Sequence, residues 1–399
     1  MKPWRCMAPE ERIGYIDGCR ALAVLGVVLD HCLVHAAWAQ RLVNQAPAMN
    51  PLFWTVTLLS KGAHGVDLFF VISGFCLSYP TLERYYREDG VNFDLDRFFA
   101  KRMVRILPPY YVALFLCLIA YVAFRMTHAA IPTAMSANIN IWDVVRQLLM
   151  LDRGTRLAND AFWTLFVEFR WYLLFPLLLA LWLRSKRSYG VLLVCLVIAY
   201  HYTRARSLDL GVLPAFMLGI VAADWHILEH PWRKYAPILA AIAFNAALLL
   251  EPFASVPGAG GVEEYGFYTQ ANVGWHLTCF FFVVAAGAWN PLRSVLSLRP
   301  LVFIGAASYS IYLVHQPIVS YAEEQMIGRL GKGGAFVASF FTSLVVGFIF
   351  WRLIELPFYR GHVLHDRLTG RLERIMGMLL GRVGIPQRFM VGRGESAVF

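Results

Sequence analysis

The chain has 399 residues, of which 58% are hydrophobic and 16% are charged, and its mean hydropathy is +0.54. Soluble domains carry about 25% charged residues, so this composition excludes a water-soluble enzyme and indicates one integral membrane domain. The net charge of +10 does not indicate a nucleic-acid partner, because the basic residues lie between apolar segments and form no contiguous basic region.

Ten apolar segments are long enough, or nearly so, to cross a bilayer core of roughly 30 Å. In chain order they begin near Ile16, Phe53, Ile106, Phe162, Tyr189, Leu208, Tyr235, Asn272, Pro300 and Gly334. The fifth and sixth run slightly short, with a polar turn at 201–209 between them. These segments predict an all-α integral membrane domain of about ten transmembrane helices over residues 12–358.

The positions of the basic residues predict the orientation of this domain. If the N-terminus is cytoplasmic, two thirds of the 36 Lys and Arg residues lie on the inside, as the positive-inside rule requires. We therefore expect both termini in the cytoplasm. The seven cysteines are scattered and include no CxxC pair, which favours neither a disulfide framework nor a metal site.

Residues 359–399 are expected to form a basic cytoplasmic tail. Between residues 360 and 382, leucine and isoleucine recur at helical spacing with arginines between them. Two interpretations fit this pattern. The segment is either an amphipathic helix on the anionic inner leaflet or a disordered basic tail.

Ionisable side chains within a span cost several kcal/mol unless they are paired or hydrated, so each is a functional candidate. Arg20 and His31 are 11 residues apart, which places them on one helix face with a rise of roughly 16 Å between them. An imidazole near mid-membrane is well suited to proton transfer at neutral pH. The alternative for His31 is a histidine that hydrogen-bonds between helices for packing.

The second span, 65–75 (GVDLFFVISGF), carries an acid, Asp67, inside an apolar run. Either a catalytic role or a structural pair with a histidine or arginine of a neighbouring helix fits Asp67. The adjacent Ser73 and Gly74 would let a helix or a ligand approach closely.

The third span begins with two arginines one turn apart, Arg102 and Arg105, which follow Lys101. Guanidinium groups suit phosphate, so this end of the helix could hold a phosphorylated ligand from the cytoplasm. The alternative is a simple positive-inside signal. The fourth span adds Glu168. This layout suits group transfer from a cytoplasmic phosphorylated donor, such as acyl-CoA, to an acceptor outside; the alternative is a transporter or flippase of a glycan or lipid.

Five ordered blocks together resemble the membrane-bound acyltransferase family 3. The blocks are 16–20 (IDGCR) with His31, 65–75 (GVDLFFVISGF), 102–108 (RMVRILP), 163–168 (WTLFVE) and 308–315 (SYSIYLVH). Members of this family are ten-helix membrane proteins that acylate glycans and other acceptors. This sequence departs from the family pattern after Glu168, where Phe169 and Arg170 replace the usual second acid and glutamine.

The resemblance implies roles for particular residues. The Arg-x10-His pair of the family corresponds to Arg20 and His31, with His31 as the catalytic base, and the Arg-x-x-Arg pair corresponds to Arg102 and Arg105 at the donor. The expected catalytic residues are His31, Arg20, Asp67 and Glu168, and the expected donor-binding residues are Arg102, Arg105, Lys101 and Ser73.

The resemblance also implies the partners and the location of the protein. We expect no metal and no bound cofactor; acyl-CoA, as acetyl-CoA or succinyl-CoA, would be the donor substrate. The acceptor would be a hydroxyl of a glycan or another molecule outside the cytoplasm. The protein would lie in the bacterial inner membrane, in contact with the lipid bilayer, and its association into homo-oligomers is left open.

Overall fold

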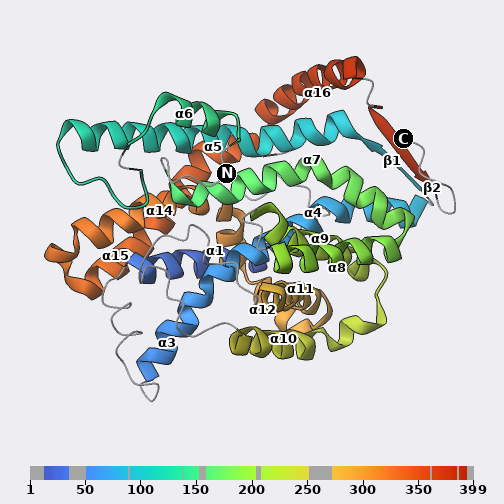
Figure 1. Ribbon diagram of the computed structural model, residues 1–399, viewed down its shortest axis with the longest axis horizontal. Coiled ribbons are helices and arrows are strands. Elements are labelled where there is room, and N and C mark those ends of the chain that lie inside the picture. The colour runs from blue at the N-terminus through green and yellow to red at the C-terminus, as the bar shows by residue number, and fades with distance from the viewer. Residues whose placement is uncertain are drawn as a thin grey trace.

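The computed structural model describes residues 13–35, 51–88, 90–136, 138–151, 159–203, 208–250, 272–359, 362–383 and 386–392, and these residues are almost entirely helical (Figure 1). The α-helices are α1 (Gly14–His35), α3 (Pro51–Ser60), α4 (Gly65–Glu88), α5 (Leu95–Met126), α6 (Ile141–Leu148), α7 (Trp163–Arg184), α8 (Lys186–Thr203), α9 (Leu208–Ile227), α10 (Ala236–Leu250), α11 (Asn272–Ala288), α12 (Asn290–Leu296), α13 (Arg299–Ala306), α14 (Ser308–Gln325), α15 (Ile327–Phe350) and α16 (Val363–Val383).

Five helical segments are long and apolar enough to cross a bilayer, and two bent helix pairs raise this number to seven. The bent pairs are α11 with α12, which meet at 97°, and α13 with α14, which meet at 68°. A helix also occupies each of the ten segments that the sequence predicts. The chain is therefore an α-helical membrane protein.

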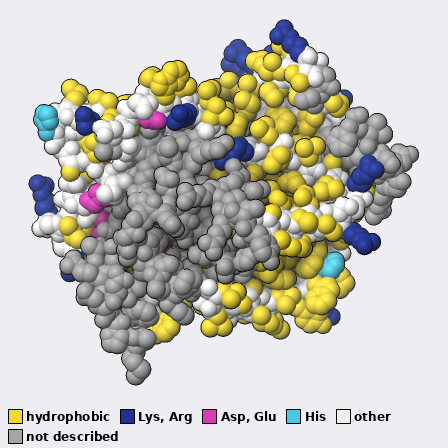
Figure 2. Space-filling model, viewed as in Figure 1, with side chains coloured by type: hydrophobic (Ala, Val, Ile, Leu, Met, Phe, Trp, Pro, Cys, Tyr) yellow, Lys and Arg dark blue, Asp and Glu magenta, His cyan; other side chains and the backbone are white. Residues whose placement is uncertain are grey.

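Hydrophobic side chains cover much of the outer surface, as expected for a protein in contact with lipid. Figure 2 shows a broad band of them on one face, with most of the visible Lys and Arg side chains near its margins. Lipid tails cannot drive helices together by the hydrophobic effect, so close packing must hold the helices against one another.

Glycines supply this close packing between α4 and α9. A Cβ added to Gly74 would lie 2.1 Å from the carbonyl oxygen of Phe216, and one added to Gly219 would lie 2.1 Å from that of Val71. The two backbones therefore touch, which confirms the close approach predicted at Gly74. At the centre of the molecule, α1 contacts α4, α11, α13, α14 and α15.

A small sheet joins the C-terminal segment to the connection between α4 and α5. Strand β1 (Gly90–Asp94) pairs antiparallel with β2 (Arg388–Gly392), beside α16 in Figure 1. Arg388 Nε lies 2.5 Å from Asp94 Oδ1, and the Gln387 side chain donates to the Gly377 carbonyl of α16 at 2.8 Å. No local sequence pattern predicts this sheet, because its two strands lie about 300 residues apart in the chain. Helix α16 itself packs along α5.

Two breaks in regular α-helix position residues of the candidate active site. The bend between α13 and α14 falls at Ala307, directly before Ser308 and Tyr309. After α15 the chain forms a π-helical turn, Trp351–Glu355, and then a 3-10 turn, Leu356–Phe358. Turns of π-helix are often found at functional sites.

Candidate active site

A pocket lies between α1, α4, α5, α7 and the α13–α14 bend, with an empty volume of about 930 Å³ counted out to its opening. Its polar and charged lining residues are Arg20, Ser73, Cys76, Arg102, Arg105, Thr164, Glu168, Tyr172, Ser308, Tyr309 and Tyr312. Five of the eight predicted site residues are among them, although they come from four different helices.

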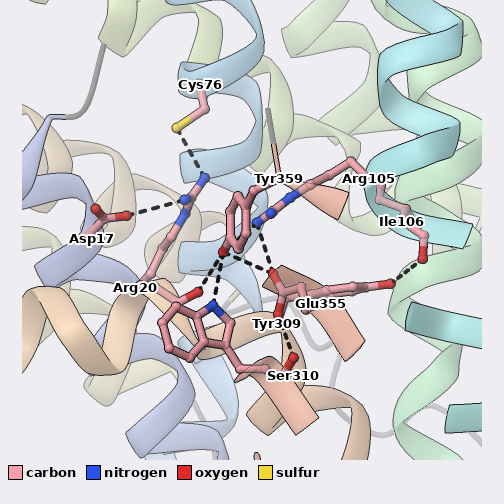
Figure 3. A network of polar contacts seen from close by, with 11 residues as sticks. Asp17, Arg20, Cys76, Arg105, Ile106, Tyr309, Ser310, Glu355 and Tyr359 are labelled. Carbon is pink, nitrogen blue, oxygen red and sulfur yellow. Dashed lines mark hydrogen bonds and ion pairs between the residues drawn. The ribbon is translucent and has the colours of Figure 1, made fainter. Parts of the chain in front are cut away.

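Arg20 reaches this pocket from α1. Its guanidinium group lies 3.4 Å from Asp17 Oδ1, one turn earlier, and donates to Cys76 Sγ of α4 at 3.4 Å (Figure 3). The Arg20 side chain keeps 31% of its surface exposed. The cation is therefore held in place by α1 and α4 and remains open to the pocket.

Arg105 is fixed by the end of the last long helix. Its Nη2 lies 3.1 Å from Glu355 Oε1 and 3.2 Å from the Tyr359 hydroxyl, and its guanidinium carbon lies 3.9 Å from the centre of the Tyr359 ring (Figure 3). Glu355 is 1% exposed and also accepts a hydrogen bond from Ser310 Oγ at 2.5 Å. The π-helical turn thus supplies a buried counter-charge that orients Arg105.

Both arginines of the predicted donor site carry buried nitrogens that are not used by the protein. Within the described part of the chain, Nε of Arg102 and Nη1 of Arg105 have no hydrogen-bond partner. Leaving a buried donor unsatisfied costs about 1–3 kcal/mol, and the cost is larger when the donor is charged. Both side chains line the pocket, so a ligand that offers anionic oxygens would remove this cost.

Glu168 faces the same pocket from α7. Its Oε1 accepts hydrogen bonds from Ser73 Oγ at 2.5 Å and from the Tyr172 hydroxyl at 2.6 Å. Two hydroxyls from two helices therefore fix the carboxylate. Ser73, which the sequence analysis assigned to the donor, directly contacts this acid.

His31 lies behind one wall of the pocket. Its ring stacks on that of His315, with 5.0 Å between ring centres and 23° between planes. His315 Nδ1 lies 2.8 Å from the carbonyl oxygen of Tyr312, and the Tyr312 hydroxyl, which accepts from Thr164 Oγ1 at 2.9 Å, lines the pocket. The Tyr312 ring, whose centre lies 5.4 Å from that of His315, is therefore next to both the pocket and the His31–His315 pair.

Asp67 belongs to a different cluster. His64 Nδ1 lies 2.7 Å from one oxygen of its carboxylate, and His276 Nε2 lies 3.2 Å from the other. The His64 ring stacks on Trp275 at 4.0 Å. Asp67 therefore pairs with a histidine of a neighbouring helix, α11, which is the structural role considered for it from the sequence. Neither Asp67 nor Lys101 lines the pocket. Among the described residues, no group of three or more His, Cys, Asp or Glu side chains could hold a metal ion.

Comparison with known protein families identifies the chain. A family model described as acyltransferase domain matches residues 13–352. The chain belongs to this acyltransferase family. The match covers the pocket, His31 and all five blocks that carry the resemblance, and it confirms that resemblance.

Relatives of this acyltransferase agree with the family match. The O-acetyltransferase OatA of Staphylococcus aureus is 25% identical over 372 residues, which cover 86% of this chain and 56% of the relative. A putative O-acetyltransferase of Staphylococcus aureus strain COL is 27% identical over 379 residues, with the same shares. The chain thus spans about half the length of the curated relatives it matches. No solved structure matches it.

Several residues at or near the pocket are not predicted from the sequence. Glu355 and Tyr359 hold Arg105 but lie 250 residues or more away from it in the chain, so spacing gives no signal for this contact. Cys76 stands in an apolar run and looks like a packing residue. One signal was available for Glu355, because an acid at the end of an apolar span requires a buried partner.

Proposed function

We propose that this protein is an integral-membrane O-acyltransferase that moves an acyl group, acetyl or succinyl, from cytoplasmic acyl-CoA to a hydroxyl of a glycan or another acceptor outside. The family match and the two O-acetyltransferase relatives support the reaction class. The single observation that carries the donor is the pair of unsatisfied guanidinium nitrogens of Arg102 and Arg105 in the pocket.

The donor fits these groups by charge. Acyl-CoA carries several phosphate oxygens, and arginine binds phosphate with two parallel hydrogen bonds. Arg102 and Arg105 would hold phosphate oxygens of the donor, and Arg20 would add a third cation from α1. The apolar residues of the pocket would surround the acyl chain and its thioester.

The acyl transfer itself requires a base at the acceptor. In this scheme His31 takes the proton of the acceptor hydroxyl while the hydroxyl oxygen attacks the thioester carbonyl. The new C–O ester bond replaces the C–S bond, and the CoA thiolate leaves with the electron pair of that bond. Tyr312, between the pocket and His31, marks the boundary that the acyl group must pass.

The topology follows the charge distribution. We propose ten membrane crossings over residues 12–358, cytoplasmic termini and a location in the bacterial inner membrane. Residues 359–399 would then lie on the cytoplasmic side, with α16 (Val363–Val383) resting on the anionic leaflet. Apolar side chains of α16, such as Met378 and Leu379, are exposed and alternate with arginines, as such a helix requires.

The donor site is tested by CoA binding to the full chain in lipid nanodiscs. Arg102→Gln should raise the Kd for CoA about 10-fold or more, because it removes a charge-assisted contact worth about 1.5–3 kcal/mol. Arg97→Gln, an exposed arginine on the same helix, is the matched control and should bind CoA normally. Equal affinities of the Arg102→Gln and wild-type proteins would refute the assignment of the donor.

A further inference from the structure

The face of α14 that lines the donor pocket continues beyond it. At about 100° per residue, Gln316 and Glu323 lie within roughly 40° and 20° of Tyr312 around the helix, and Glu323 is roughly 16 Å further along its axis. Tyr312 lines the pocket. Gln316 and Glu323 therefore lie on the side of α14 that leads away from the pocket, with the buried Val319 between them, and we call these two residues the polar stripe of α14.

Each residue of this stripe has a buried side-chain oxygen that accepts no hydrogen bond from the described part of the chain. Gln316 is 5% exposed and Glu323 is 3% exposed. Within the residues that the structure describes, Oε1 of Gln316 and Oε2 of Glu323 have no donor. The other oxygen of Glu323 accepts from Ser339 Oγ of α15 at 3.3 Å. A buried carboxylate oxygen without a donor is costly, so the protein retains it at the expense of its own stability.

The stripe also lies beside the catalytic histidine. Ser339 Oγ is 3.3 Å from Cys32 Sγ, the side chain that follows His31 on α1, and the His31 ring stacks on His315 of α14. Glu323 is thereby joined through one serine to the turn of α1 that carries the expected base.

The donor pocket and the polar stripe of α14 lack opposite kinds of hydrogen-bond partner. In the donor pocket the unsatisfied atoms are N–H donors of Arg102 and Arg105, which call for an anion. On α14, Oε1 of Gln316 and Oε2 of Glu323 lack donors among the described residues and call for O–H or N–H groups. In an O-acyl transfer, the substrate that brings hydroxyl donors to the base is the acceptor.

We propose that the face of α14 between Tyr312 and Glu323 is the acceptor subsite, where Gln316 and Glu323 accept hydrogen bonds from hydroxyls of a polyhydroxylated substrate. This inference rests on the proposed function. Binding places one further hydroxyl of the same substrate at His31. Glu323 and Gln316 are positioning residues, since they hold the acceptor and take no part in bond making.

The neighbouring residue provides a matched control. Glu324 is half-buried, and its carboxylate accepts hydrogen bonds from the backbone N–H and the hydroxyl of Thr133, so it holds the connection after α5 against α14. Glu323→Gln and Glu324→Gln each remove one carboxylate charge, at adjacent positions of α14. Only the first change touches the proposed subsite.

The test is steady-state acyl transfer from acetyl-CoA by the full chain in nanodiscs, with the tetrasaccharide chitotetraose as the polyhydroxylated probe and butan-1-ol as a single-hydroxyl comparison. Glu323→Gln should raise the KM for chitotetraose about 10-fold or more and leave the KM for acetyl-CoA and the use of butan-1-ol unchanged. Its melting temperature should be equal or higher, because a buried charge has been removed. Glu324→Gln should behave as wild type toward both substrates.

Three results would overturn the inference. They are an unchanged KM for chitotetraose in Glu323→Gln, an equal rise in the KM for acetyl-CoA, and a lower melting temperature with activity lost toward both acceptors, which is the signature of a structural role. Wild-type protein that acetylates butan-1-ol but not chitotetraose would also overturn it. Wild-type protein that consumes no acetyl-CoA with either acceptor would instead contradict the proposed function.

Discussion

Arg105 illustrates how single residues of this site depend on distant parts of the chain. Its partner Glu355 belongs to the π-helical turn after α15, and Tyr359 stacks on its guanidinium group. The ion pair leaves one guanidinium nitrogen of Arg105 for a ligand. Glu355 therefore serves the pocket through Arg105, without lining it.

Glu355→Gln should weaken both the fold and the binding of CoA. The change removes the counter-charge of Arg105, and the loss of one partner of a largely buried pair costs about 1–3 kcal/mol. We expect a lower melting temperature and a Kd for CoA raised by roughly 10-fold. The double variant Glu355→Gln/Arg105→Gln should lose little further affinity, because the two residues act as one unit.

An exposed pair supplies the control for this experiment. Glu88 pairs with Arg87 at the surface, and both side chains are more than half exposed. Glu88→Gln should leave the melting temperature and CoA binding unchanged, since exposed ion pairs contribute little. If Glu355→Gln behaved as this control does, the positioning of Arg105 by Glu355 would be wrong.

At the scale of elements, glycine contacts decide how closely the helices pack. Gly74 and Gly219 bring α4 and α9 into backbone contact. The same helix α4 carries Ser73 and Cys76 into the pocket on its other side. The separation between α4 and α9 thus helps to set the position of the pocket wall.

Gly74→Ala should destabilise the protein by about 1–3 kcal/mol, because its Cβ would overlap the backbone of α9. Gly190→Ala on α8 is the matched substitution, since a Cβ there meets no atom within 4 Å. It should keep or raise stability, because alanine has the higher helix propensity. Thermal unfolding in detergent distinguishes the two, and equal melting temperatures would refute the role assigned to Gly74.

At the scale of the whole molecule, the sequence predicts the helices well and their contacts poorly. A helix occupies each of the ten segments that hydropathy locates, because each segment must satisfy its own backbone hydrogen bonds. The β1–β2 sheet, the pair of Arg105 with Glu355 and the two histidines around Asp67 join residues far apart in the chain. No local pattern encodes such contacts.

The sequence likewise identifies many residues of the candidate site but not the contacts between them. Arg20, Ser73, Arg102, Arg105 and Glu168 stand out because they are polar residues within or beside apolar spans, and they do share a pocket. Asp67 stands out for the same reason and lies elsewhere, since a buried acid needs partners whether or not it is functional. Polarity within a span therefore reveals that a residue is paired but does not reveal with what.

The proposed topology can be checked with alkaline phosphatase, which is active only outside the cytoplasm. A phosphatase inserted after Lys332, next to the break in α15 at Gly331, should be active. One inserted after Arg187, at the start of α8, should be inactive, because Arg184, Lys186 and Arg187 mark an inside connection. The reverse pattern would contradict cytoplasmic termini.

The most direct test of the whole account is a single-turnover measurement with His31→Ala in nanodiscs, using radiolabelled acetyl-CoA and a hydroxyl acceptor. The substitution removes the proposed base and leaves the lining of the proposed donor pocket unchanged, because His31 is not part of that lining. The account predicts that the variant binds CoA with wild-type affinity and forms acetyl ester at least about 100-fold more slowly. Ester formation at the wild-type rate by a folded His31→Ala protein would contradict it.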